Sequence, residues 1–167
     1  RVFDNAECEF SYRNSIFKNH LANQYVVWSV VFKLNLTYVP NVSYKALRLA
    51  LDERGIDTPD SGQLIDVVTD VRWSKLPRPE VMGSAGSFFK NPVVSHDRYE
   101  TLKREYPDLV AYEVSGGYKL AAGWLIDRAG WKGRSMGNAG VYEQQALVLV
   151  NRGGCSACEL LRLADAI

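Results

Sequence analysis

The chain has 167 residues, enough for one domain or two small ones, and 47% of them are apolar, so a hydrophobic core can form. Its twenty basic and nineteen acidic residues leave a net charge of +1, which provides no general electrostatic attraction to nucleic acid or to an anionic membrane. No apolar run reaches the roughly 18 residues that a membrane-spanning helix needs. The N-terminus also lacks the basic and apolar regions of a signal peptide. We therefore expect neither nucleic acid nor a membrane as a partner.

The first third of the chain is expected to contain a long strand followed by a short helix. Apolar residues alternate within residues 25–38, at Val26, Trp28, Val30, Phe32, Leu34 and Leu36. A period of two with β-branched and aromatic residues is typical of a strand. Ser43 is the expected cap of a helix that begins at Tyr44 and stops at Gly55.

A candidate domain boundary follows at residues 56–62, IDTPDSG, where proline, glycine, serine and two aspartates gather. Ser61 predicts the start of the next helix. Leu64, Val68 and Val71, at i, i+4 and i+7, predict its buried face.

The remaining residues interleave helices and strands. We expect a helix from Ser95 to about Tyr106, a buried helix over Lys119–Arg128 with Leu120, Trp124 and Leu125 inward, a short strand over Gln145–Asn151, and a final helix that begins at a capping box of Ser156 and Glu159. Long connections between mixed elements favour an α+β fold over a regular parallel α/β repeat.

Two of the three cysteines, Cys155 and Cys158, form a C-x-x-C pair. One pair is half of a zinc site at best, and neither histidine has ligand spacing near it. We expect ordinary reduced cysteines, no metal site and a cytoplasmic protein. The alternative is a redox or metal protein that uses the pair, in which case changing both cysteines to serine abolishes function.

The segment Gly83–Pro92, GSAGSFFKNP, begins with five small residues that cannot fill a core. Small residues let a ligand approach the backbone closely, and Phe88 and Phe89 then anchor the segment. It is neither a P-loop nor a G-x-G-x-x-G motif. Taken alone, it is either a ligand site or a glycine-rich turn that leads into an edge strand.

Two further segments place a cation beside anchoring residues. In FSYRNSIFK, residues 10–18, Arg13 lies among aromatic residues and is suited to stabilise an oxyanion. Lys75 lies just before Leu76 and Pro77, where the backbone is expected to be extended, and is a candidate contact for a phosphate or carboxylate. A surface arginine and a solvated lysine are the alternatives.

Together these segments resemble the bacterial UDP-N-acetylenolpyruvoylglucosamine reductase family, also called UDP-N-acetylmuramate dehydrogenase or MurB. The matching pieces lie in the family order, with YRNSIFK at 12–18, KLPRPEVMGSAGSFFKNP at 75–92, KLAAGWLID at 119–127, KG at 132–133, and QQALVLVN at 144–151. They span nearly the whole chain, and GSAGSFFKNP combined with KLAAGWLID is highly specific.

The resemblance implies a cytoplasmic bacterial oxidoreductase of peptidoglycan precursor synthesis. Such an enzyme uses NADPH and bound FAD to reduce the enolpyruvyl group of UDP-N-acetylglucosamine enolpyruvate, which yields UDP-N-acetylmuramate. Arg13 matches the arginine that stabilises the enolate, and Ser87 matches the serine that protonates the other carbon. The residues that match substrate contacts are Tyr44, Lys75, Asn91, Tyr112, Lys132 and Gln145. The expected partner is the UDP-sugar substrate, and the expected state is a monomer.

In family terms, residues 1–59 are the C-terminal part of an FAD-binding domain, and residues 60–167 are a substrate-binding domain truncated at its end. The family's glycine-rich flavin-binding segments are expected before residue 1, and its catalytic glutamate after residue 167. The alternative is a UDP-sugar-binding domain without catalysis. The full reading frame distinguishes the two, because only the enzyme has both of those features.

The resemblance predicts that residues 1–167 alone bind FAD weakly and have little or no reductase activity, because the flavin-binding segments are expected to lie outside them. Titration of the purified chain with FAD, followed by flavin fluorescence, measures the affinity directly. Tight flavin binding or turnover of the UDP-sugar would refute this expectation.

Overall fold

The computed structural model describes all 167 residues. They divide into two compact units, residues 1–39 and residues 40–167, and each is described by itself. None of the helices combines the length and the apolar character that crossing a membrane requires.

The unit of residues 1–39 is built around one short helix, η1 (Ile16–Lys18). Ile16 is buried, and the ring of Phe3 packs edge-to-face against the rings of Phe17 and Tyr25. The predicted strand over residues 25–38 is wrong, because this segment is extended but forms no strand. Its alternate apolar side chains are exposed, among them Trp28 with 95% of its surface accessible. Alternation marks a segment that suits a sheet, but a strand also needs a paired neighbour for its backbone groups.

The second unit begins with two helices that pack on each other, α1 (Lys45–Glu53) and α2 (Ser61–Trp73). Leu47, Leu51 and Val67 form their buried contact. Val67 rather than the predicted Val68 is the inward residue, because Val67 lies on the same face of α2 as Leu64 and Val71, which pack against this cluster as predicted.

Both predicted caps of these helices are displaced by one residue. Tyr44, not Ser43, is the N-cap of α1, and its side chain makes no capping bond. Asp60, not Ser61, caps α2, and it forms a reciprocal capping box with Gln63. The domain boundary between residues 59 and 60 stays a prediction, and α1 and α2 pack on each other across it.

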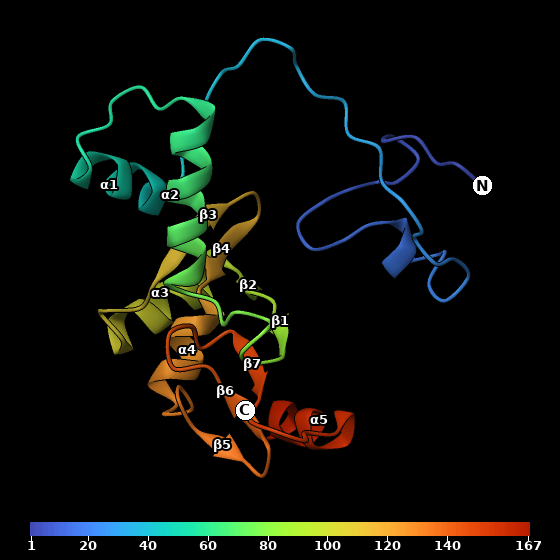
Figure 1. The fold of residues 1–167 in the computed structure, drawn as a ribbon. Coiled ribbons are helices and arrows are strands. Elements are labelled where there is room, and N and C mark those ends of the chain that lie inside the picture. Colours follow the sequence, from blue (N-terminus) through green and yellow to red (C-terminus); the bar gives the residue numbers. More distant parts are fainter. The chain divides into compact units, whose positions relative to one another are not determined.

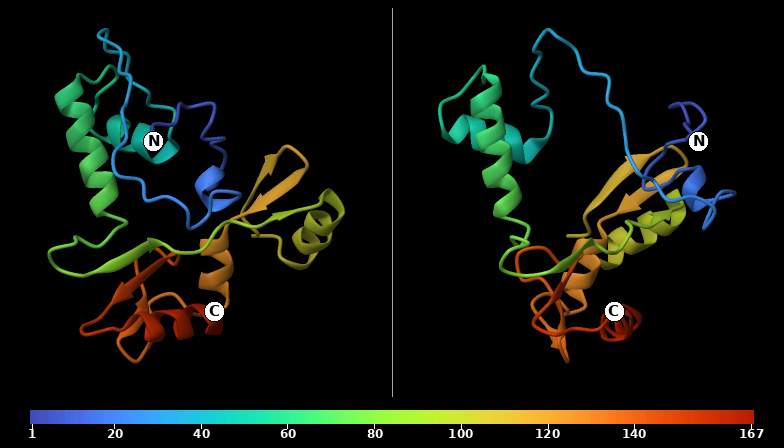
Figure 2. Two further views of the ribbon diagram at one scale, coloured as in Figure 1. Left: turned by 90° about the vertical axis from the view of Figure 1, so that its right-hand side faces the viewer. Right: turned by 45° about the vertical axis from the view of Figure 1, so that its right-hand side comes forward.

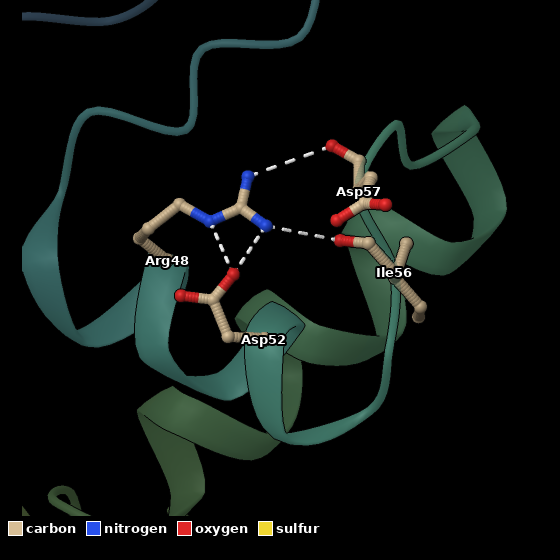
Figure 3. A network of polar contacts seen from close by, with 4 residues as sticks. All are labelled: Arg48, Asp52, Ile56 and Asp57. Atoms are coloured by element: carbon tan, nitrogen blue, oxygen red, sulfur yellow. Dashed lines mark hydrogen bonds and ion pairs between the residues drawn. The ribbon is translucent and has the colours of Figure 1, made fainter.

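The turn between α1 and α2 is held by one arginine (Figure 3). The Arg48 guanidinium binds the Asp52 carboxylate one helical turn away and donates to the backbone carbonyls of Ile56 and Asp57. These bonds satisfy carbonyl groups that follow the helix end. The positive φ of Gly55, 67°, lets the chain reverse there.

Two antiparallel sheets make up the rest of the unit (Figures 1 and 2). The four-stranded sheet has the order β1-β7-β6-β5, with β1 (Ser84–Ser87), β5 (Ser135–Met136), β6 (Ala139–Val141) and β7 (Val148–Asn151). The three-stranded sheet has the order β2-β4-β3, with β2 (Val93–Val94), β3 (Ala111–Val114) and β4 (Gly117–Leu120). The expected α+β fold is confirmed.

Three helices accompany these sheets, α3 (His96–Glu105), α4 (Ala122–Arg128) and α5 (Ala157–Ala166). The predicted cap at Ser95 is confirmed, and α3 packs on β4, where the ring of Tyr99 stacks on that of Tyr118. Figure 1 shows α5 beside β5 and β6, and the capping box of Ser156 and Glu159 is confirmed at its start.

Two predicted elements in this region are shorter than expected. The helix predicted over Lys119–Arg128 begins only at Ala122, because Lys119 and Leu120 pair with β3 as the end of β4. The strand predicted over Gln145–Asn151 is limited to β7. Leu149 on β7 and Leu163 on α5 are fully buried in the main core, against which Phe88 and Phe89 pack as expected.

The capping box predicts a pH-dependent part of the stability. Bonds from the Ser156 backbone N–H and hydroxyl and from the Asn138 N–H hold the pKa of Glu159 below its ordinary value of 4.5. A depressed folded-state pKa contributes stability that is present above the unfolded pKa and is lost as pH falls through the folded pKa. Glu159→Gln keeps an acceptor but does not titrate, so the stability difference between wild type and variant should shrink as pH falls below about 4.5.

Urea unfolding of both proteins between pH 3 and pH 7 measures this difference. Ser156→Ala, which removes the hydroxyl bond, should flatten the same dependence in part. If the stability difference between wild type and Glu159→Gln stays constant with pH, the capping box does not lower the pKa of Glu159.

Candidate functional site

The main candidate site is a cavity of about 430 Å³ within residues 40–167. Its lining comes from six separate parts of the chain. The polar side chains among the lining residues are Tyr44, Asn91, Tyr112, Trp124, Asp127, Lys132, Gln144 and Gln145. Five of the six predicted substrate contacts are therefore brought together, and the sixth, Lys75, lies beside one of them.

Asn91 lines the cavity and also holds the start of α4. Its side-chain oxygen accepts a hydrogen bond of 2.9 Å from the backbone N–H of Ala122, the first residue of that helix. This bond satisfies one of the N–H groups that a helix start leaves without a partner. It also orients the carboxamide, so the NH2 group of Asn91 is kept as a donor for another acceptor.

Gln145 is oriented in the same way. Its side-chain oxygen accepts from the backbone N–H of Leu147 at 3.4 Å, which leaves its NH2 group as a donor. Gly123 lies directly against this carboxamide, since a Cβ at that position would be 3.2 Å from the Gln145 oxygen. The absence of a side chain at Gly123 is what lets α4 approach Gln145 so closely.

The two predicted lysines each contact another residue of the site. Lys132 Nζ lies 3.0 Å from the Asp127 carboxylate, and both side chains line the cavity. Lys75 Nζ lies 3.4 Å from the Tyr44 hydroxyl and 5.4 Å from the centre of its ring. Lys75 thus reaches the site through Tyr44, with a cation–π contact that adds to the hydrogen bond.

Sequence reasoning missed Trp124 and Asp127 as site residues, because it interpreted KLAAGWLID mainly as core. The two residues are three apart on α4, which places both on one face of the helix. A polar residue three positions after a tryptophan, in an otherwise apolar helix, is the signal that would have identified this face.

Ser87 is the last residue of β1, an edge strand that carries a bulge. Ser84 pairs with Val150 and Ser87 with Val148, so β1 has one residue more than β7 over the same span. Gly86 supplies the positive φ of 64°. Ser87 is exposed and does not line the cavity. The next residue, Phe88, donates its N–H to the carbonyl of Leu147, and Leu147 does line the cavity.

Arg13 lies in a tight turn of the first unit. Ser11 and Asn14 exchange both backbone hydrogen bonds at 3.1 Å, and Arg13 between them has a positive φ of 55°. Left-handed backbone is unfavourable for a residue with a long side chain and is frequent at functional positions. Lys18 Nζ donates to the Arg13 carbonyl, which helps to hold the turn.

The cysteine pair lies at the start of α5. Cys155 precedes the N-cap and packs against the main core, and Cys158 is exposed in the first turn. Both are free thiols, and no group of three or more metal-ligating side chains occurs in the chain.

A smaller cavity of about 290 Å³ lies at the other end of β1 and β7. Val81, Met82, Gly83, Asn151, Arg152 and Gly153 line it. The Asn151 side-chain oxygen already accepts from the N–H groups of Gly153 and Cys155, and Arg152 is paired with Glu143.

Comparison with known proteins places these features in one family. Residues 78–167 match the model of the UDP-N-acetylenolpyruvoylglucosamine reductase C-terminal domain. Curated proteins named UDP-N-acetylenolpyruvoylglucosamine reductase are 49% identical in Bdellovibrio bacteriovorus, over 98% of this chain and 48% of that protein, and 52% identical in Paraburkholderia phytofirmans, over 96% of this chain and 47% of that protein. The chain thus spans about half of the length of these curated relatives.

Among solved structures, the UDP-N-acetylenolpyruvylglucosamine reductase of Thermus caldophilus matches 66% of this chain and 32% of its own, with a TM-score of 0.39 at 24% identity. The family assignment follows from the sequence matches. The chain belongs to the UDP-N-acetylenolpyruvoylglucosamine reductase family, with the C-terminal domain of that family at residues 78–167.

Proposed function

We propose that residues 40–167 bind the UDP-sugar substrate of a UDP-N-acetylenolpyruvoylglucosamine reductase, in the cavity of about 430 Å³. One observation carries the proposal. Residues expected to contact the substrate are spread from Tyr44 to Gln145, yet five of the six line one cavity. Proximity in sequence does not bring them together, so a shared ligand is the simplest reason for their meeting.

The chemistry of the cavity supports a nucleotide sugar. The NH2 groups of Asn91 and Gln145, the hydroxyls of Tyr44 and Tyr112, and the Lys132 ammonium are hydrogen-bond donors. A diphosphate and a uracil ring present mainly acceptors, which complement these donors, while the Asp127 carboxylate in the same lining is paired with Lys132. The cavity volume also lies in the usual range of about 300–1,000 Å³ for small-molecule sites.

Arg13 and Ser87 are proposed to act on the enolpyruvyl group. When the enol ether is reduced, negative charge spreads onto the neighbouring carboxylate, and the Arg13 guanidinium is suited to neutralise it with two parallel bonds. The Ser87 Oγ would donate a proton to the substrate carbon that becomes basic. Ser87 is exposed at the end of the bulged strand, while the next two residues, Phe88 and Phe89, pack against the core.

NADPH-reduced FAD, when bound, would supply the hydride of this reaction. We assign neither cavity to the flavin, because the larger is lined by the groups proposed to bind the nucleotide sugar, and Arg152 in the smaller is paired with Glu143. The same proposal places the protein in peptidoglycan precursor synthesis. It also includes a location in the bacterial cytoplasm and a monomeric state.

Asn91→Asp tests the cavity without disturbing α4. The carboxylate still accepts from the Ala122 N–H, but it replaces the NH2 donor by a negatively charged oxygen. Because a ligand acceptor then faces an anion, the affinity for UDP-N-acetylglucosamine should fall tenfold or more. Isothermal titration calorimetry on residues 1–167 measures it.

The control is Asn19→Asp, which adds the same charge at an exposed position in the other unit and should bind as wild type does. Equal affinity of Asn91→Asp and wild type would rule out Asn91 as a contact. A wild-type chain that fails to bind UDP-N-acetylglucosamine would overturn the proposed function itself.

Ser87→Ala tests the catalytic proposal in the complete reductase. Loss of a general acid lowers kcat by about 10²–10⁴-fold. Ser87 does not line the cavity, so KM should change little. Steady-state kinetics with UDP-N-acetylglucosamine enolpyruvate separates the two parameters, and an unchanged kcat would remove Ser87 from the mechanism.

A further inference from the structure

An ion pair lies behind the segment that carries Gln145. The connection from β6 to β7 runs through residues 142–147, and its last four residues line the cavity. Glu143 is the second residue of this connection, and its carboxylate lies 2.7 Å from Nη2 of Arg152, the residue that follows β7. Neither Glu143 nor Arg152 lines the main cavity.

Arg152 is itself held firmly at the end of the hairpin. Its backbone N–H donates to the carbonyl of Asn138 at 2.8 Å, and its Nη2 also reaches the carbonyl of Val141 at 3.4 Å. The stem of the side chain crosses Gly140, where a Cβ would be 2.8 Å from Arg152 Nε. The side chain is only 25% exposed. Arg152 therefore links the open end of the hairpin, through its backbone, to Val141 and Glu143 at the other end, through its guanidinium.

Glu143 also lies beside Gly133, the residue that follows the cavity residue Lys132. A Cβ on Gly133 would be 3.8 Å from the Cβ of Glu143, and Gly133 follows Lys132 directly. The pKa of the Glu143 carboxyl lies below its ordinary value, mainly because this carboxyl accepts the hydrogen bond from Arg152. Glu143 is therefore charged at neutral pH.

We infer that Glu143 and Arg152 act as a positioning pair, which orders residues 144–147 and so holds Gln145 in place for the ligand. The part of this inference that concerns the ligand rests on the proposed function, whereas the ordering of residues 144–147 does not depend on it. Neither residue lines the main cavity, so both are argued to act through the segment that does. An arginine that forms bonds to both a carboxylate and a carbonyl is suited to this task, because its planar guanidinium fixes several acceptors at once.

Amide hydrogen exchange tests the order of the segment without any ligand. Glu143→Gln and Arg152→Met should each speed exchange of the amides of residues 144–147 about fivefold or more, and the double variant should add little to either. Arg152→Lys keeps the positive charge but loses the planar set of donors, so its exchange rates should lie between those of wild type and Arg152→Met. Glu53→Gln, which removes an exposed carboxylate at the end of α1, is the matched control and should leave these amides unchanged.

Unchanged exchange of residues 144–147 in Glu143→Gln would overturn the inference. So would faster exchange throughout β6 and β7, which indicates a general loss of stability and not a local ordering role.

Binding of UDP-N-acetylglucosamine tests whether the ordering of residues 144–147 affects the affinity for the ligand. Glu143→Gln should weaken the affinity about fivefold, and it should have no further effect in a Gln145→Ala background. Additive losses in the two variants would show that Glu143 does not act through Gln145, which overturns its positioning role. If the wild-type chain does not bind this probe, the proposed function fails, while the exchange experiment still decides whether the pair orders the segment.

Discussion

Strand β7 pairs with β6 on one side and with β1 on the other, and the organisation of residues 78–167 depends on these two ladders. Its residues Val148, Leu149 and Val150 are completely buried, so the strand is held by apolar packing as well as by hydrogen bonds. The β1 ladder fixes GSAGSFFKNP beside the core. The β6 ladder fixes the hairpin connection that carries Gln145 into the cavity. One buried strand thus positions both segments on which the proposed function rests.

The cavity is built from residues that serve the fold and the ligand together. The Asn91 carboxamide holds the start of α4 with its oxygen, and the Gln145 carboxamide holds the N–H of Leu147 in the same way. Each residue is left with an NH2 donor in a defined orientation. Donors that are fixed before a ligand arrives cost less entropy on binding. This dual use suits the cavity to the acceptor-rich ligand that we propose for it.

Ion pairs have different roles in different parts of the second unit. Arg48 secures the turn between α1 and α2, Lys132 and Asp127 lie inside the cavity, and Arg152 and Glu143 lie behind it. Exposed pairs of this kind contribute little to global stability, typically about 0–1 kcal/mol. Their value here is geometric, because each one fixes a connection whose ends are already set by helices or strands.

The sequence by itself determined the family, the α+β class, the caps at Ser95 and Ser156, and five residues that share the cavity. The fold class and the caps depend on local chemistry that is visible along the chain, whereas the family and the five residues came from the resemblance of whole segments to a known family. Tertiary structure decided what depends on partners from elsewhere. Lys119 and Leu120 join a sheet because β3 is there to pair with them, and the alternating segment at residues 25–38 forms no strand without a paired neighbour. Likewise, Trp124 and Asp127 became site residues only when α4 came to lie against Gln145, an approach that Gly123 permits.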